Sequence, residues 1–323
     1  MALSLAFLTA CLGALLVGWS INQGGICSVG ATHDLVERRD PRLTIGIAFA
    51  AATAGLVLLP ASWLSGGQVH LTGSVSIGGS LILGAVLLGI GAVVNDACLL
   101  GSLGRLGNGE VRFLGLPVGL AIGYALTRIS PVEVRTSPSM LDHPSATGSL
   151  LLAVFALLLL ATGWRLIRDR THIDERRYPL CIAMLILGLC GAMLYAARPG
   201  WGYADAVQRG FGGAPMAMPM LMIDGAGGSW LALMTVTGSI CAAMMAGRFA
   251  ARRPTPRGVF RSVVGGMLMA IGAVRVPGGN DSLLLAAIPS GSASGILAYG
   301  TMTLTVFMLL LVTRISVHVS RTR

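Results

Sequence analysis

Two of the six cysteines lie in segments that differ in composition from the apolar sequence around them. Cys27 occurs in GICSVGA and Cys98 in NDACLLGSLGRLG, which are rich in glycine, serine or asparagine. A thiol is a weak hydrogen-bond donor with a soft sulfur, which suits a sulfur-bearing anion better than a fully oxygenated one. Packing as small hydrophobes is the alternative for this pair, and it is the prediction for the cysteines in ordinary apolar runs.

Charged and polar residues near two helix breaks complete the candidate set. Arg275 lies within an apolar run, where a buried charge is costly and usually functional, although a long side chain near a helix end can reach the interface instead. Asn95–Asp96 and Asn280–Asp281 each precede a short helical stretch, so we predict that they cap helix N-termini. The alternative is that Asp96 or Asp281 carries a proton during transport.

Motifs of several enzyme classes are absent from the sequence. No Ser/His/Asp or HExxH arrangement occurs, the cysteines lack the spacing of a zinc site, and there is no P-loop. We therefore expect no enzyme activity, no metal or other cofactor, and no ATP-driven transport by this chain alone.

The composition indicates an integral membrane protein. Hydrophobic residues make up 54% of the chain, charged residues make up 11%, and the mean hydropathy is +0.78. A soluble chain has about 25% charged residues, so a soluble enzyme, a disordered chain and a nucleic-acid-binding protein are excluded despite the net charge of +10. The 45 glycines follow no period of three and favour helices packed closely in lipid.

The apolar runs predict an all-α fold with about nine transmembrane helices. The runs are Ala2–Trp19, Leu43–Leu64, Ile77–Val94, Phe113–Thr127, Ser149–Leu166, Leu180–Ala197, Ser229–Gly247, Val263–Val276 and Ile296–Thr313. Arginines cluster after the first, fifth, seventh and ninth runs. Because positive charge is retained on the cytoplasmic side, we predict a bacterial inner-membrane protein with its N-terminus outside and its C-terminus in the cytoplasm.

The chain contains a weak internal repeat. Gly78–Leu100 and Val263–Leu285 both carry IGAV, then ND and an apolar pair, and the arginine pattern gives them opposite orientations. Inverted repeats are typical of transporters. We therefore predict one transport domain, 1–323, with repeat halves at about 1–147 and 148–323; chance similarity between glycine-rich helices is the alternative.

Three further segments, Ser20–Ala31, Asn95–Asn108 and Gly278–Ser294, are too long for tight turns, and we predict that they form re-entrant half-helices. Irregular backbone at membrane depth is tolerated where it lines a cavity or is buried in protein, and open helix N-termini attract anions. Arg198–Asp224 contains APMAMPMLM and is predicted to be an irregular interfacial loop. Copper binding by its methionines is the alternative.

Three motifs resemble those of the YeeE/YedE family of sulfur-transport membrane proteins. NQGGICSVGATHDLV begins at Asn22, GAVVNDACLLGSLGRLGNGE at Gly91, and RSVVGGMLMAIGAVRVPGGNDSLLLAAIPSGSASG at Arg261. The resemblance implies re-entrant helices in an hourglass of two inverted halves. It also implies passage of thiosulfate along a line of thiols, with Cys27 and Cys98 at the first and central positions.

The third cysteine position departs from this family pattern. Gly278, Gly279 and Asn280 stand where the family has a GGCN-like stretch, so Gly279 replaces the third thiol. The backbone N–H groups of this stretch, with Arg275 nearby, would then bind an oxyanion. Together with Cys27 and Cys98, these residues are the predicted substrate-binding set.

We therefore predict an importer of a small sulfur-containing anion, thiosulfate first, embedded in membrane lipid. The alternatives are a membrane thiol oxidoreductase or sulfur-transfer protein that uses Cys27 and Cys98, a selenium-related membrane protein, and a scaffold for a soluble cytoplasmic sulfur carrier. An oxidoreductase requires the two sulfurs to approach, with Cα atoms about 4.4–6.8 Å apart. A structure that holds them well apart would exclude it.

Overall fold

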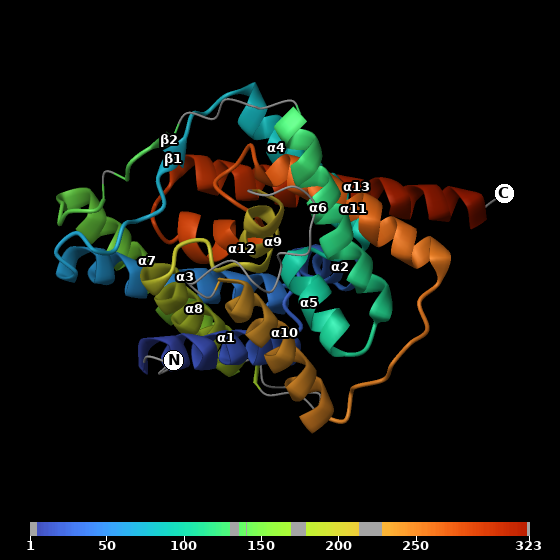
Figure 1. The fold of residues 1–323 in the computed structure, drawn as a ribbon, viewed down its shortest axis with the longest axis horizontal. Coiled ribbons are helices and arrows are strands. Elements are labelled where there is room, and N and C mark those ends of the chain that lie inside the picture. The colour runs from blue at the N-terminus through green and yellow to red at the C-terminus, as the bar shows by residue number, and fades with distance from the viewer. Residues whose placement is uncertain (1–4, 130–135, 140, 169–178, 213–227, 322–323) are drawn as a thin grey trace.

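The computed structural model describes residues 5–129, 136–139, 141–168, 179–212 and 228–321, which are predominantly helical (Figure 1). The described strands are short: β1 (Ser74–Val75) pairs antiparallel with β2 (Thr136–Ser137). Helices therefore form both the core and the surface, and the predicted all-α fold class is confirmed.

Each predicted apolar run coincides with a long helix. These helices are α1 (Leu5–Gly24), α3 (Arg42–Leu64), α4 (Gly79–Asn95), α6 (Gly115–Ile129), α7 (Ala146–Arg168), α8 (Leu180–Ala197), α10 (Gly228–Met245), α11 (Pro256–Ala273) and α13 (Ala293–Arg321). Within the described residues, 6 helical segments are long and apolar enough to cross a membrane, and Trp230–Met245 is a shorter apolar helix. The chain is a multi-pass membrane protein; the full span number stays a prediction.

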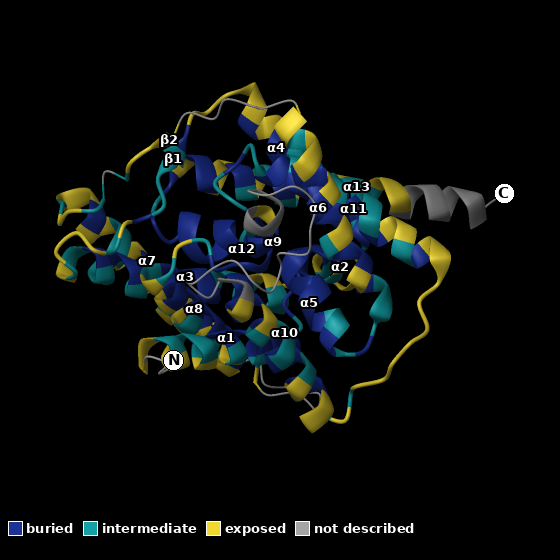
Figure 2. Cartoon of the chain, viewed as in Figure 1, coloured by how far each residue is buried: buried dark blue, intermediate teal, exposed yellow. Residues whose placement is uncertain are grey.

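Short helices overlap the three segments predicted to form half-helices, although Ser20–Gly24 of the first segment belongs to α1 instead. They are α2 (Ser28–His33), continued by the π-helix η1 (Asp34–Arg38); α5 (Leu99–Gly107), followed by the 3-10 helix η2 (Val111–Leu114); and α12 (Asn280–Ser282), continued by the π-helix η4 (Leu283–Ala287). Figure 2 shows that α5 and α12 lie among buried elements. Protein thus covers these helix breaks; their re-entry into a membrane stays a prediction.

The predicted irregular loop Arg198–Asp224 is partly wrong, because it contains a helix, α9 (Tyr203–Gly212). Tyr203, Ala204 and Val207 are buried, and α9 packs against α6 and α10. Tertiary packing stabilises this short helix, whose sequence has no long apolar run. The methionine-rich stretch 214–222 lies outside the described residues.

Glycines let pairs of long helices approach closely. α4 crosses α11 at Gly91 and Gly265, where a Cβ on Gly91 would lie 2.7 Å from the Gly265 carbonyl oxygen. α1 approaches α10 in the same way, because a Cβ on Gly18 would collide with the Thr235 carbonyl oxygen. Small residues permit this approach in membranes, where helix association depends on packing and hydrogen bonds.

The helix contacts occur in matched pairs. α1 packs against α10 as α8 packs against α3, and α6 packs against α11 as α13 packs against α4. The short elements show the same correspondence, since α5 contacts α1 and α10, while η4 contacts α8 and α3. In an inverted repeat, each element of one half packs as its counterpart in the other half does. The division into halves at 1–147 and 148–323 stays a prediction.

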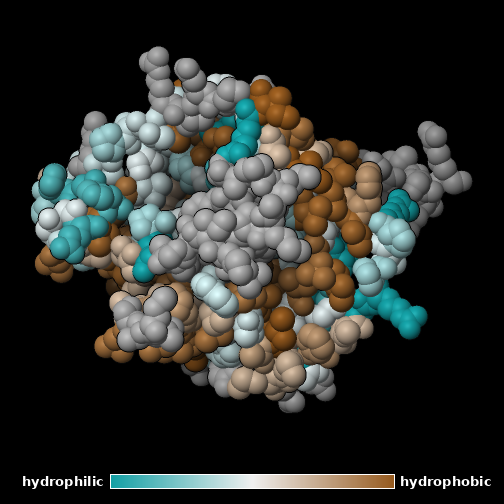
Figure 3. Space-filling view, in the orientation of Figure 1, coloured by the Kyte–Doolittle hydropathy of each residue, from teal (hydrophilic) through white to brown (hydrophobic). Residues whose placement is uncertain are grey.

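Apolar side chains cover the outer faces of several long helices. Val118, Ile122 and Leu126 of α6 are exposed, and Figure 3 shows apolar surface over α6 and the adjoining α11. Hydrophilic side chains gather toward the connection 248–255, at the right-hand edge of this view. Lipid tails suit the apolar faces, while water and lipid headgroups suit the arginine-rich edge.

Candidate functional site

Three short helices begin at breaks in the chain. α2 starts after Cys27, α5 after Cys98 and α12 after Gly279, and each of these N-cap residues has extended backbone. Glycines in the left-handed region precede two of the starts, Gly25 with a φ of 60° and Gly278 with a φ of 94°. Glycine adopts this conformation without steric strain. The chain therefore turns sharply before it re-enters a helix.

The two cysteine thiols at these starts are buried and lie against the same residue, Gly101. The exposed fraction is 7% for Cys27 and 1% for Cys98. The Cys98 sulfur accepts hydrogen bonds from the N–H groups of Ser28 and Gly101, with N–S distances of 3.3 and 3.4 Å. The Cys27 sulfur lies against Gly101, where a Cβ would collide with it. The Cys98 sulfur thus accepts hydrogen bonds from the first turns of both α2 and α5.

Asn280 connects the third helix start to the first. Its Nδ2 donates to the Ser28 hydroxyl at 3.5 Å, and this hydroxyl shares a hydrogen bond of 3.2 Å with Tyr299 of α13. The Asn280 Oδ1 is buried and has no partner among the described residues. Gly279 packs beside Leu99, since a Cβ on Gly279 would lie 2.9 Å from the Leu99 Cδ1. The helix-start cluster, as we name it, consists of Cys27, Ser28, Cys98, Gly279 and Asn280.

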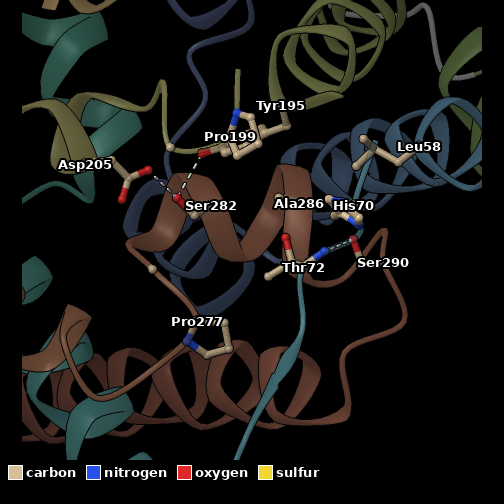
Figure 4. A pocket seen from close by; sticks show the side chains of 12 residues that line it. Leu58, His70, Thr72, Tyr195, Pro199, Asp205, Pro277, Ser282, Ala286 and Ser290 are labelled. Carbon is tan, nitrogen blue, oxygen red and sulfur yellow. Dashed lines mark hydrogen bonds between the residues drawn. The ribbon is translucent and has the colours of Figure 1, made fainter. Parts of the chain in front are cut away.

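Cavities lie on two sides of the helix-start cluster. The first cavity, about 190 Å³, reaches Gly278 and Ser282, which flank Gly279 and Asn280 (Figure 4). The second, about 260 Å³, reaches Ser28 and is otherwise lined mainly by apolar side chains. Along α3, Leu58 lines the first cavity and Thr44 lines the second. The cluster therefore lies between two cavities that open at different levels of α3.

The chain was also compared with known protein families. The family model described as Sulphur transport matches residues 23–308, a range that includes Cys27, Cys98 and Gly279. The chain belongs to this family. The family expected from the three motifs is thus confirmed, and the protein is a sulfur-related membrane transporter. No curated protein matches the chain in sequence.

In this sulfur-transport protein, Arg275 lies between α4 and the end of α11. Its Cβ is close to Gly84, and its guanidinium donates a hydrogen bond to the Ile271 carbonyl oxygen. None of the contacts described for Arg275 reaches Cys98 or Asn280. The structure therefore brings the two cysteines, Gly279 and Asn280 together, but it places the predicted arginine elsewhere.

The two Asn-Asp pairs do not cap the helix starts, so the capping prediction is wrong. The N-cap positions belong to Cys98 and Gly279. Asn95 still lies inside α4 and donates a hydrogen bond to the Ala97 carbonyl oxygen, while Asn280 is already in α12. A cap is the extended residue directly before the helix. The N-cap position thus follows the first pair, at Cys98, and precedes the second pair, at Gly279.

Asp96 belongs to a charge cluster beside α5. It ends α4 with a φ of 66°, and it pairs with Arg105 and Arg112 at N–O distances of 2.8 and 2.9 Å. Arg112 also pairs with Glu110 at 3.4 Å and lies 4.4 Å from the Phe113 ring centre. These contacts hold the connection after α5 against the end of α4, which is a structural role for Asp96.

The sequence interpretation missed Ser28 and Gly101, which bind the Cys98 sulfur, and Tyr299, which binds the Ser28 hydroxyl. Gly101 lies three positions after Cys98, so the first-turn geometry of a helix would have indicated its contact with that sulfur. Ser28 donates to the same sulfur from 70 positions away, which first-turn geometry does not indicate. Tyr299 lies 271 positions from Ser28 in the chain. Nothing local in the sequence indicates that contact.

Proposed function

We propose that this protein imports a small sulfur-containing anion, with thiosulfate as the first candidate, along a path lined by the helix-start cluster. The observation that carries the proposal is the meeting of two thiols, a hydroxyl and an amide next to two cavities. The path would lead from Gly278 in the first cavity, past Asn280 and Cys98, to Ser28 and Tyr299 in the second.

The chemistry of the cluster suits transient anion binding. N–H groups at helix starts carry partial positive charge and point toward a bound anion. The thiols of Cys27 and Cys98 add weak donors and polarizable sulfur, which match the terminal sulfur of thiosulfate. Several weak contacts in a row let an ion leave as readily as it enters. Binding of this strength favours passage over storage.

The arginine pattern supports a direction of transport. α3 begins beside Arg38, Arg39 and Arg42, which we place in the cytoplasm of a bacterial cell, so its other end and the first cavity face outward. This orientation puts the N-terminus outside the inner membrane and the C-terminus in the cytoplasm. The matched helix contacts support inverted halves at 1–147 and 148–323. The arginine-rich connections would contact anionic lipid or a soluble sulfur carrier.

Uptake of radiolabelled thiosulfate by proteoliposomes tests this proposal directly. We expect uptake above the level of protein-free liposomes. Unlabelled thiosulfate should inhibit it more strongly than sulfate does, because sulfate lacks the soft terminal sulfur that a thiol accommodates. Uptake no faster than in the protein-free control would contradict the proposal, and equal inhibition by both anions would contradict the role of sulfur.

Gly279→Cys is expected to preserve or raise thiosulfate uptake, because it restores a thiol at the third family position. The backbone allows the change, since Gly279 has a φ of −71°. The new Cβ would lie 2.7 Å from the Asp281 Oδ1 and 2.9 Å from the Leu99 Cδ1, so these two side-chain ends must shift. Gly279→Ser is the matched control, with oxygen in place of sulfur. Equal uptake by the two variants would show that the added sulfur has no effect.

A second candidate function is thiol–disulfide chemistry at Cys27 and Cys98. The position of both sulfurs against Gly101 favours it, because the two sulfurs are then not held well apart. Disulfide formation would release two protons and pass two electrons to an oxidant such as a quinone. Cys27 and Cys98, once paired in a disulfide, would then resist alkylation when turnover is stopped by denaturation. Full alkylation of both cysteines throughout turnover would exclude this chemistry.

A further inference from the structure

Asp281 is a buried carboxylate directly beside the helix-start cluster. It follows Asn280 in the first turn of α12, and its exposed fraction is 5%. Its Oδ1 has no hydrogen-bond partner among the described residues. Burial of an ionised carboxylate with an unpartnered oxygen is costly, and the neutral acid avoids that cost. A positively charged ligand at this oxygen would therefore stabilise the buried carboxylate.

A second carboxylate, on Asp205 of α9, lies close to Asp281. A Cβ on Gly202 would lie 2.5 Å from the Asp281 Oδ2, 3.1 Å from the Asp205 Oδ2 and 3.0 Å from the Tyr195 hydroxyl. The Ser282 hydroxyl donates to Asp205 at 3.1 Å and shares a hydrogen bond of 2.8 Å with Tyr195 (Figure 4). Glycine at position 202 leaves room for these oxygens to converge.

A proton fits this arrangement better than a metal ion. Two neighbouring carboxylates in a buried site disfavour simultaneous ionisation, and one proton removes the conflict. Within the described residues, no group of three or more His, Cys, Asp or Glu side chains could hold a metal ion. Asp205 and Ser282 line the first cavity, which provides a route for a proton from that side.

We propose that Asp281, together with Asp205, binds a proton that crosses the membrane with the transported anion. This inference rests on the proposed function. Asp281 adjoins Asn280, so its negative charge would repel an anion in the helix-start cluster, and protonation removes that repulsion. Because such coupling is reciprocal, a bound anion also strengthens proton binding. The proton gradient then becomes a driving force for uptake.

Other ionisable side chains occur on or next to the elements near α12 and in the lining of the first cavity. Asp205 is the neighbouring carboxylate, while the remaining groups are neutral phenols, a thiol, an imidazole and a guanidinium. They are Tyr203 of α9, Tyr195 of α8, Arg198 after α8, Tyr124 of α6, Tyr299 of α13, Cys98 before α5, and His70 in the lining of the first cavity. The test must therefore assign any pH dependence to Asp281 by substitution.

Thiosulfate uptake at a clamped membrane potential tests the inference. In the wild type, an inward gradient of one pH unit should raise thiosulfate accumulation by up to about tenfold if one proton is coupled. Thiosulfate addition should also acidify a pH dye inside the vesicles. Asp281→Asn, which resembles the protonated acid, should lose both effects while thiosulfate exchange continues. Glu37→Gln, which alters an exposed carboxylate distant from Asp281 in the sequence, is the matched control.

Several outcomes would overturn the inference. An undiminished pH-gradient response in Asp281→Asn would remove the role of this residue, and a response to sodium gradients instead of proton gradients would replace the proton as ligand. If Asp281→Asn does not fold, Asp205→Asn provides the test. Loss of the neighbouring charge should move the pH dependence of uptake to lower pH, because Asp281 would then hold its proton less strongly. An unchanged pH dependence would count against the pair.

An infrared titration separates this inference from the proposed function. The wild type at neutral pH and without thiosulfate should show the carbonyl band of a protonated carboxylic acid, and Asp281→Asn should lack it. If the wild type takes up no thiosulfate but shows the band, the transport proposal fails and proton binding at Asp281 is supported. Absence of the band overturns proton binding whether or not thiosulfate is transported.

Discussion

Cys98→Ala is expected to lower thiosulfate uptake by roughly 10- to 100-fold while the protein stays folded. Cys98 is 1% exposed, and its sulfur binds the first turns of α2 and α5 through Ser28 and Gly101. A hydrogen bond to a charged ligand contributes about 1.5–3 kcal/mol, which corresponds to a loss of this size. Initial rates of radiolabelled thiosulfate uptake, at equal amounts of reconstituted protein, measure the effect.

Two further variants make this result specific to Cys98. Cys98→Ser keeps a small polar group at the helix start and should retain more uptake than Cys98→Ala. Cys241→Ala removes an exposed cysteine from α10 and should leave uptake unchanged. Elution of all three proteins at the wild-type position in size exclusion would establish that they are folded. Wild-type flux through Cys98→Ala would remove the thiol from the transport path.

Gly101→Ala should reduce uptake to a similar extent, although it removes no polar group. The new Cβ would collide with the Cys27 sulfur, so the thiol or the first turn of α5 must move. Overpacking of this kind costs about 1–3 kcal/mol in a well-packed interior. Because Cys27 belongs to the helix-start cluster that lines the proposed path, the displacement should appear in flux more strongly than in thermal stability.

Gly104→Ala is the matched control for this prediction. Gly104 lies one turn further along α5, and a Cβ there would meet Ile21 at 3.4 Å, an ordinary van der Waals contact. Both variants change helix propensity in the same way. Equal flux through Gly101→Ala and Gly104→Ala would mean that the position of the Cys27 thiol does not control transport.

The membrane environment of the protein and the positions of most of its helices can be predicted from local sequence. α8 was predicted as Leu180–Ala197 and has those bounds in the structure. A helix in lipid must be apolar over a length set by the bilayer, and both properties are readable from a single stretch of chain. α9 was not predicted, because its stability comes from burial against α6 and α10 rather than from its own hydropathy.

The helix breaks were also readable, but the partners across them were not. Glycines around Cys27 and Gly279 indicated the starts of α2 and α12, since glycine alone adopts positive φ freely. The fold then brings the Ser28 N–H to the Cys98 sulfur, 70 positions away, and the Ser28 hydroxyl to Tyr299, 271 positions away. No local pattern encodes such distances along the chain.

The sequence by itself determined the environment of this protein, the positions of its helices and the family to which it belongs. Tertiary structure alone decided which polar groups share one site: Cys98 with Ser28, and Asp281 with Asp205. It also removed Arg275 from the site that its sequence position had indicated. The physical reason is that hydropathy and backbone conformation are local properties, whereas a binding site forms only where separate helices pack closely enough for their starts to meet.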